Sequence, residues 1–192
     1  MKTSASWEDG KMRCFWANPQ NKRYVRYHDE EWGRPTHDDQ ALFELLTLEC
    51  FQAGLSWECV LNKRDGFRRA FADFDLDRVC DFTEAEMDRL MKDPEIIRHR
   101  RKIEAAVNNA RVFREIAREY GNFAEYLWQW TDGKIIYDPV SATSPLSDDV
   151  SKDLKKRGMK FVGSTTIQSY LQSVGIINAH QPGCFLFEGN LT

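Results

Sequence analysis

The chain has 192 residues, 42% hydrophobic and 30% charged, which suits one globular domain or two small lobes. No apolar run approaches the ~20 residues of a membrane span, no secretory signal opens the chain, and five scattered Cys do not resemble a disulfide framework. The net charge of −3 argues weakly against nucleic acid, although local clusters of charge matter more than the sum. We expect a cytoplasmic monomer with no membrane partner.

The first third of the chain holds the most informative predicted element, a helix over residues 38–53. We expect a flexible leader over 1–12, a folded domain over 13–187 and a tail over 188–192. Asp38 or Asp39 can cap the helix and Gly54 can end it. At 100° per residue one narrow face collects Leu42, Leu45, Leu46 and Ala53.

Glu49 falls in the middle of that apolar face, so its carboxylate points at the predicted core. Burying an uncompensated carboxylate costs roughly several kcal/mol, so the group must be protonated, paired or reserved for a cationic ligand. A helix shifted by a few residues would place Glu49 in solvent instead. The helical wheel alone does not decide between these two interpretations.

Short helices account for most of the remaining chain, and the class is all-α. Asp65-Gly66 should break the helix that follows Ser56, and Gly121 should end the longest helix. Residues 131–146 read as a loop in which Lys134–Tyr137 is the one strand candidate, and the chain after Ala179 reads as irregular. The predicted helices after Gly54 cover 56–64, 67–74, 83–91, a first turn at Pro94, 101–120, 123–130, 147–157 and 165–174.

Two Cys and two His near the chain ends form a candidate metal site: Cys14, His28, His180 and Cys184. Two thiolates and two imidazoles suit tetrahedral zinc, and four protein ligands would leave no open position for a catalytic water. A closed zinc site would join two chain ends that have little secondary structure. The alternative is that both Cys are small buried hydrophobes and both His are solvated.

Aromatic and basic residues gather around the same motifs. Flat side chains can sandwich a flat ligand, or can simply fill the core, and five lie close to Glu49 or to the candidate metal ligands: Trp16, Tyr24, Tyr27, Trp32 and Trp57. The basic runs Arg98–Lys102 and Lys152–Lys160 could hold phosphate or be solvated faces. Leu55, at a turn, could be a wedge into a base stack or a buried helix-start residue.

Together these motifs resemble the 3-methyladenine DNA glycosylase I family. The resemblance runs from about Met12 to about Phe187, and its motifs are long and ordered. They are Arg13-Cys14-Phe-Trp16, Tyr27-His28-Asp-Glu-Glu-Trp32-Gly33, Glu49-x-x-Gln52-Ala-Gly-Leu-Ser-Trp57, Ile96-Ile-Arg-His-Arg100, Lys155-Lys-Arg-Gly-x-Lys-Phe-Val-Gly163 and His180-x-x-Gly-Cys184.

The resemblance implies a helix-hairpin-helix glycosylase fold with one structural zinc ion on the four ligands above. It implies a monofunctional enzyme that excises N3-methyladenine from alkylated double-stranded DNA and releases the free base. The chain departs from the family pattern at Cys50, Glu95 and Arg101, where glycines are usual. The residues expected to act are Glu49 and Tyr27 in catalysis, Trp16, Tyr24 and Trp57 in base binding, and Leu55, Arg98, Arg100, Lys156 and Lys160 on DNA.

Three other functions deserve comparison with this one. A zinc-stapled nucleic-acid-binding module without catalysis would have little use for a buried acid. A metal-dependent hydrolase built on Cys14, His28 and His180 would need an open coordination position. A glycosylase on the same scaffold could accept another base, such as 3-methylguanine.

Overall fold

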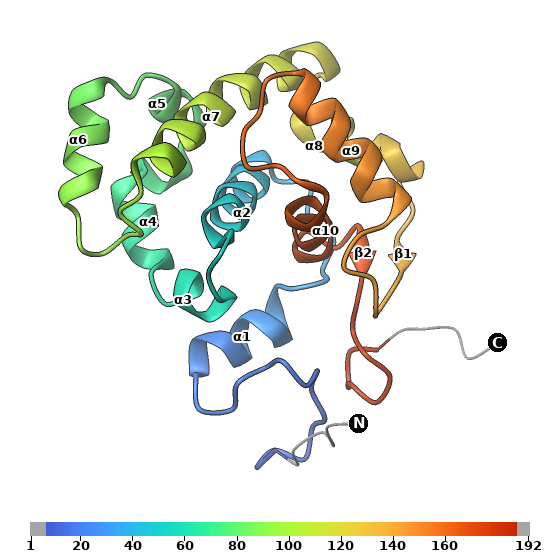
Figure 1. Ribbon diagram of the computed structural model, residues 1–192. Helices are drawn as coiled ribbons and strands as arrows, with labels where there is room; N and C mark the ends of the chain where they lie inside the picture. The colour runs from blue at the N-terminus through green and yellow to red at the C-terminus, as the bar shows by residue number, and fades with distance from the viewer. Residues whose placement is uncertain (1–6, 188–192) are drawn as a thin grey trace.

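The structure is a computed structural model that describes residues 7–187, and it is mostly helical (Figure 1). None of its helices is both long enough and apolar enough to span a bilayer, among the residues described. The α-helices are α1 (Lys22–Glu30), α2 (Asp39–Gln52), α3 (Trp57–Leu61), α4 (Arg64–Ala70), α5 (Leu76–Cys80), α6 (Glu84–Lys92), α7 (Arg100–Tyr120), α8 (Phe123–Trp128), α9 (Pro145–Lys156) and α10 (Ser164–Ser173). Single 3-10 turns, η1 (Ala72–Phe74) and η2 (Gln129–Thr131), and two short strands, β1 (Ile136–Tyr137) and β2 (Ile177–Asn178), complete it.

Helix α2 lies at the centre of the fold, packed against α3, α7, α8 and α10 (Figure 1). Asp38 caps it as predicted, accepting a hydrogen bond from the Ala41 amide. The prediction of one narrow apolar face was wrong, because every residue from Leu42 to Phe51 is buried and Ala53 is an exposed residue beyond the helix end. A helix covered on all sides shows no single apolar stripe. The interpretation of Glu49 as a buried acid was nevertheless right, since its side chain is inside.

The predicted break at Asp65-Gly66 was also wrong. The chain breaks three residues earlier, at Asn62-Lys63, and α4 runs through Gly66. A Cβ at Gly66 would lie 2.4 Å from the carbonyl oxygen of Glu95, so this glycine allows α4 to pack on the backbone between α6 and α7. Glycine is therefore required here for a close approach rather than for a turn.

Other local predictions also needed correction. Helices α1 and α5 were missed, while Pro94 begins a turn and no helix. The region after α10 contains β2, which pairs in parallel with β1 through Ile136–Ile177 and Tyr137–Asn178. A two-residue strand leaves no alternating pattern in the sequence, so only its partner segment was recognised.

The segments before α1 and after β2 lie side by side and join the two ends of the described chain (Figure 1). The Phe185 amide donates to the carbonyl oxygen of Met12 at 2.7 Å, and the Phe15 amide donates to Gln181 Oε1 at 3.1 Å. Neither segment is helical, and a backbone hydrogen bond together with side-chain contacts joins them. The candidate metal ligands lie within this junction.

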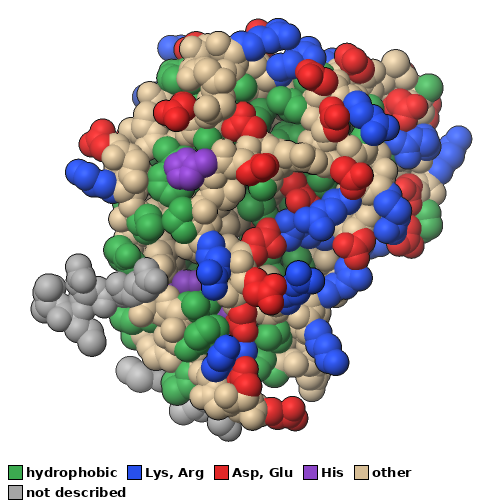
Figure 2. Space-filling view, turned by 180° about the vertical axis from the view of Figure 1, so that it is seen from behind, with side chains coloured by type: hydrophobic (Ala, Val, Ile, Leu, Met, Phe, Trp, Pro, Cys, Tyr) green, Lys and Arg blue, Asp and Glu red, His purple; other side chains and the backbone are tan. Residues whose placement is uncertain are grey.

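Acidic and basic side chains are interspersed on the face seen in Figure 2. Among the described residues on that face, positive charge does not form a continuous field.

Candidate active site

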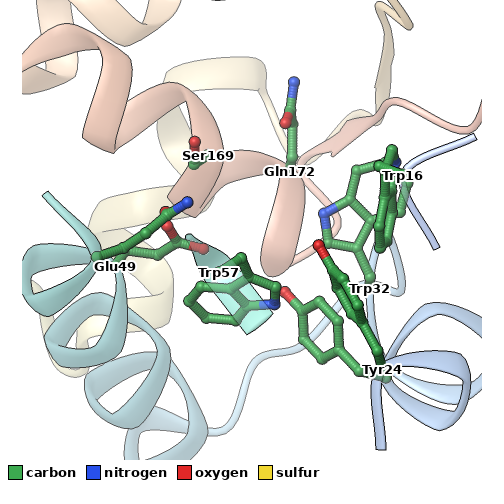
Figure 3. Close-up of a pocket in the computed structure, with 9 residues that line it drawn as sticks. Trp16, Tyr24, Trp32, Glu49, Trp57, Ser169 and Gln172 are labelled. Atoms are coloured by element: carbon green, nitrogen blue, oxygen red, sulfur yellow. The ribbon is translucent and has the colours of Figure 1, made fainter. Parts of the chain in front are cut away.

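A cavity of about 150 Å³ lies between α2, α3, α10 and the segment around α1. Figure 3 shows Glu49 and Trp57 on one side, Trp16 and Trp32 on the other, and Ser169 and Gln172 on α10. Its lining residues are Trp16, Tyr24, Tyr27, Trp32, Glu49, Gln52, Trp57, Ser169 and Gln172.

The aromatic walls of the cavity support one another. Trp16 packs edge-on against Trp32 with ring centroids 4.7 Å apart, and Tyr24 lies tilted at 5.3 Å from Trp16. On the other side Tyr27 packs at 5.2 Å from Trp57. Rings fixed in this way form a preshaped slot with flat faces, which suits an aromatic ligand.

Two buried polar atoms in this slot have no hydrogen-bond partner: Glu49 Oε2 and Trp57 Nε1. The Glu49 side chain is 4% exposed, and burial raises its pKa from 4.5 to about 8. A buried acceptor without a partner is costly, so its persistence in a cavity indicates a ligand that supplies a donor or a positive charge. These two unpartnered atoms, one acceptor and one donor, are therefore available to the edge of a bound ring.

Both tyrosines at the cavity stay protonated at neutral pH. Burial raises the pKa of Tyr24 to about 12, and the acids Glu58 and Glu49 add to the shift. Burial, and then the charge of Glu49, raises the pKa of Tyr27 well above 10. Their hydroxyl groups are thus available as hydrogen-bond donors beside the carboxylate.

Cys14, His28, His180 and Cys184 converge in one buried cluster whose ligand atoms all lie within 4.8 Å of one another. The Sγ–N separations are 3.5 Å for Cys184 and His28 Nε2, and 3.6 Å from His180 Nδ1 to either sulfur. Bond lengths typical of tetrahedral zinc place sulfur and nitrogen ligands about 3.6 Å apart. These three separations fit such a geometry, and the four side chains could hold a metal ion of this kind.

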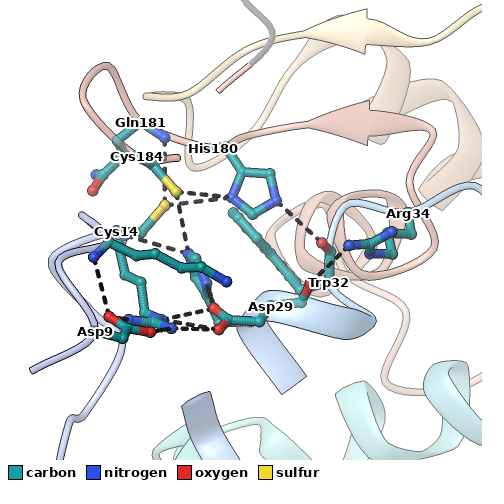
Figure 4. A network of polar contacts seen from close by, with 11 residues as sticks. Asp9, Cys14, Asp29, Trp32, Arg34, His180, Gln181 and Cys184 are labelled. Carbon is teal, nitrogen blue, oxygen red and sulfur yellow. Dashed lines mark hydrogen bonds and ion pairs between the residues drawn. The ribbon is translucent and has the colours of Figure 1, made fainter. Parts of the chain in front are cut away.

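The other ring nitrogen of each histidine is held by the protein (Figure 4). His28 Nδ1 lies 2.8 Å from Asp29 Oδ1, and Arg13 holds that carboxylate through Nε at 2.8 Å and Nη2 at 2.6 Å. His180 Nε2 lies 3.2 Å from the carbonyl oxygen of Trp32. These contacts fix the orientation of both rings and leave His28 Nε2 and His180 Nδ1 facing the two sulfurs, as expected for metal ligands.

The cluster also supports the cavity wall. Trp16 packs edge-on against the His28 ring at 5.1 Å, and Trp32 packs edge-on against His180 at 4.7 Å. Two aromatic residues of the cavity wall therefore pack directly against candidate metal ligands. Loss of order in the cluster would move these rings as well as the chain ends.

The predicted DNA-contacting residues differ in their solvent exposure and in their ion pairs within the protein. Leu55 is 41% exposed, and Arg98, Lys156 and Lys160 are exposed. The Asn109 side chain holds the backbone of Lys160 through two hydrogen bonds. Asn109 Oδ1 accepts from the Lys160 amide at 2.8 Å, and Asn109 Nδ2 donates to the Lys160 carbonyl oxygen at 2.9 Å.

Arg100 is the exception, since its guanidinium forms ion pairs with Glu84, Asp88 and Glu104. Much of its charge is therefore neutralised within the protein.

Comparison with known proteins identifies the family. The model of the methyladenine glycosylase family matches residues 16–187. The chain belongs to this family. The resemblance to 3-methyladenine DNA glycosylase I indicated by the sequence motifs is thus confirmed, and so is the prediction of a glycosidase, an enzyme of the hydrolase class.

Relatives of this glycosylase match along nearly their whole length. The DNA-3-methyladenine glycosylase 1 of Escherichia coli (strain K12) is 42% identical over 185 residues, 93% of this chain and 98% of that protein. A crystal structure of a 3-methyladenine DNA glycosylase I is 41% identical with a TM-score of 0.87, covering 91% of this chain and 99% of that one. Another, a variant in complex with 3-methyladenine, is 38% identical with a TM-score of 0.83 and covers 86% and 92%.

Three residues that line the glycosylase cavity were not predicted, Gln52, Ser169 and Gln172, and Trp32 was named among the candidate aromatics without an assigned role. Trp32 and Gln52 stand within the motifs that carry the family resemblance. Ser169 and Gln172 lie three residues apart on α10, which the sequence presents as an apolar helix. Polar residues at that spacing share one helix face and were the available signal.

The cysteine that replaces the usual glycine after Glu49 does not line the cavity. Cys50 Sγ lies 3.8 Å from the carbonyl oxygen of Lys160 and 3.8 Å from Asn109 Nδ2. Its side chain therefore fills a contact between α2, α7 and the segment before α10.

Proposed function

We propose that this glycosylase excises N3-methyladenine from alkylated double-stranded DNA by hydrolysis of the N-glycosidic bond after the nucleotide is extruded from the helix. The unpartnered carboxylate of Glu49 inside an aromatic slot carries this proposal. Methylation at N3 makes adenine cationic, which is the property that a buried acid can recognise. The relative solved with 3-methyladenine bound supports the same ligand for this cavity.

The extruded base would stack between Trp16 and Trp57, where a cationic ring gains additional attraction from aromatic faces. Glu49 would accept hydrogen bonds from the adenine edge. Tyr24 and Tyr27, both protonated, would shape the slot and polarise it. A base of this charge fits the cavity better than a neutral purine does.

The chemistry needs no proton transfer to the base. The glycosidic bond of the cationic nucleotide is already weakened, and the base departs as a neutral molecule while the sugar becomes oxocarbenium-like. Among the described lining residues Glu49 is the single carboxylate. We therefore assign catalysis to extrusion, exclusion of bulk water and stabilisation of the bound base, followed by attack of water on the sugar.

A structural zinc ion is proposed for the cluster of Cys14, His28, His180 and Cys184. Two thiolates and two imidazoles whose ligand atoms lie within 4.8 Å of one another are a donor set that zinc prefers. With four protein ligands the ion would pin the chain ends and take no part in hydrolysis. The rival metal-dependent hydrolase would need a vacant position that this ligand set does not provide.

The direct test is to incubate the protein with DNA methylated at adenine N3 and to follow release of free base by chromatography. Abasic sites should appear as strand breaks only after alkali, because the family acts without a lyase step. Undamaged DNA and DNA carrying 3-methylguanine serve as comparators. Binding of methylated DNA without base release would contradict the proposed excision and favour a DNA-binding module without catalysis.

The rate of excision should depend on pH through Glu49. Because burial raises the pKa of Glu49 to about 8 in the empty cavity, its ionised form becomes scarcer below that pH. We expect kcat/KM to rise about tenfold per pH unit below 8 and then to level off. The cationic base stabilises the carboxylate, so kcat should level off at a lower pH. A flat profile for kcat/KM between pH 6 and 8 would contradict a required ionised Glu49.

Lys156 and Lys160 should contribute to DNA binding mainly through charge. Replacement of either by Ala should weaken binding to undamaged duplex and lower the slope of log Kd against log salt by about one. Arg98→Ala should behave alike, whereas Arg100→Ala should change the slope less because three carboxylates already hold that side chain. Exposed Lys134, before β1, supplies the control substitution. Equal slopes for all variants would place the DNA elsewhere.

A further inference from the structure

Lys102 belongs to the basic run Arg98–Lys102 but does not face solvent with it. Its side chain is buried, at 6% exposure, whereas Arg98 and Arg101 are exposed. Its Nζ donates to the carbonyl oxygen of Phe51 at 2.8 Å and to that of Ala53 at 2.6 Å. A lysine from the first turn of α7 therefore reaches the far end of α2.

The end of α2 needs such a donor. The last carbonyls of a helix have no partner within it, and they form the negative end of the helix dipole. Ala53 leaves the helix at φ −46° and ψ 114°, and Gly54 follows at φ +81°. The Lys102 ammonium supplies hydrogen bonds and positive charge at this place.

The turn that Lys102 holds joins α2 to α3, the two helices that line one side of the cavity. We call residues 53–56 the wedge turn, because exposed Leu55 lies within it. Glu49 and Gln52 precede the turn and Trp57 follows it, and all three line the cavity. A Cβ at Gly54 would meet no atom within 4 Å, so packing does not brace the turn there.

The other end of Lys102 belongs to the segment that carries exposed arginines. The His99 side chain caps α7 by accepting from the Lys102 amide at 3.3 Å. Arg98 and Arg101 flank this cap and are exposed. A single residue thus connects the basic start of α7 with the turn that bears Leu55.

We propose that Lys102 is a positioning residue that holds the wedge turn in the conformation in which Leu55 enters the base stack. Binding of the DNA backbone at the start of α7 is thereby coupled to extrusion of the damaged nucleotide. This inference rests on the proposed function, because it concerns how the base reaches the cavity. It assigns Lys102 no contact with the base.

The test compares Lys102→Met, Leu55→Ala and the double variant. Lys102→Met keeps the aliphatic chain and removes both hydrogen bonds. Free 3-methyladenine, followed by tryptophan fluorescence, should bind it within about twofold of the unmodified protein. Single-turnover excision from duplex DNA, and the signal of a 2-aminopurine beside the lesion, should fall about tenfold or more. The double variant should lose little beyond Leu55→Ala, because both changes act on one step.

Lys134→Met is the matched control and should match the unmodified protein in each measurement. Normal excision by Lys102→Met, an equal loss of free-base binding, or multiplying effects in the double variant would each overturn the proposal. If Lys102→Met does not fold, Lys102→Gln takes its place, because it retains one hydrogen-bond donor. Leu55→Ala by itself tests whether Leu55 acts as a wedge, and normal excision by this variant also overturns the proposal. Absence of base release by the unmodified protein would instead remove the proposed function.

Discussion

Glu49→Gln should abolish most excision and, at the same time, make the protein more stable. The substitution keeps the shape of the side chain and removes its charge, which is the property a cationic base would recognise. We expect single-turnover excision of 3-methyladenine to fall about 100-fold or more, a loss of about 3 kcal/mol in transition-state stabilisation. The rate is measured with methylated duplex DNA at saturating enzyme.

The gain in stability follows from the raised pKa of Glu49. Between pH 4.5 and 8 an unfolded chain releases this proton while the folded chain keeps it, so the free energy of unfolding falls as pH rises. Over this pH range the free energy of unfolding should fall by at most about 5 kcal/mol, and we expect a fall of about 3 kcal/mol. Glu49→Gln does not titrate, so its advantage should be near zero at pH 4 and largest above pH 8.

Urea denaturation at several pH values measures this difference directly. Exposed Glu125, on α8, provides the control, because Glu125→Gln removes an equal charge without relieving a buried one. A Glu49→Gln protein less stable than the original at pH 8.5 would show that the carboxylate has a favourable partner in the folded state. This result would contradict the interpretation of Glu49 as an unpartnered carboxylate that binds a cationic ligand.

The same carboxylate shows how far sequence reasoning reached. Glu49 was recognisable because it falls among apolar residues in the assumed register, and the surrounding motif favoured that register over a shifted one. The assumed helix face was still wrong, because α2 is covered on every side and a wheel shows no direction for such a helix. Local pattern identified the residue, whereas tertiary packing determined its surroundings.

Contacts between segments that are far apart in the sequence could not be predicted from local patterns. Ser169 and Gln172 reach the cavity from α10, more than a hundred residues after Glu49, and no local pattern connects them. Lys102 reads as one of five neighbouring basic or polar residues, and only the fold separates the buried one from the exposed ones. By contrast, the four metal-ligand candidates were predictable because few other side chains share their chemistry.

Removal of one of the proposed metal ligands should have the largest effect on stability. In Cys184→Ser the cluster loses a soft anionic ligand, and we expect the protein as purified to lose its bound metal. Structural zinc sites contribute apparent binding energies of about 10–16 kcal/mol in small domains. In a chain with its own helical core we expect a smaller loss, about 5 kcal/mol in the free energy of unfolding. Elemental analysis and thermal unfolding measure the two effects.

Cys59→Ser is the matched control, because Cys59 is an exposed thiol outside the cluster. It should keep one metal ion per chain and its unfolding temperature. Since Trp16 and Trp32 rest on His28 and His180, the Cys184→Ser protein should bind 3-methyladenine more weakly even where it stays folded. Excision per bound base should change far less, because the proposed hydrolysis has no step that involves the cluster. Unchanged metal content in Cys184→Ser would exclude it as a ligand, and loss of turnover on chelation without loss of stability would favour a catalytic metal instead.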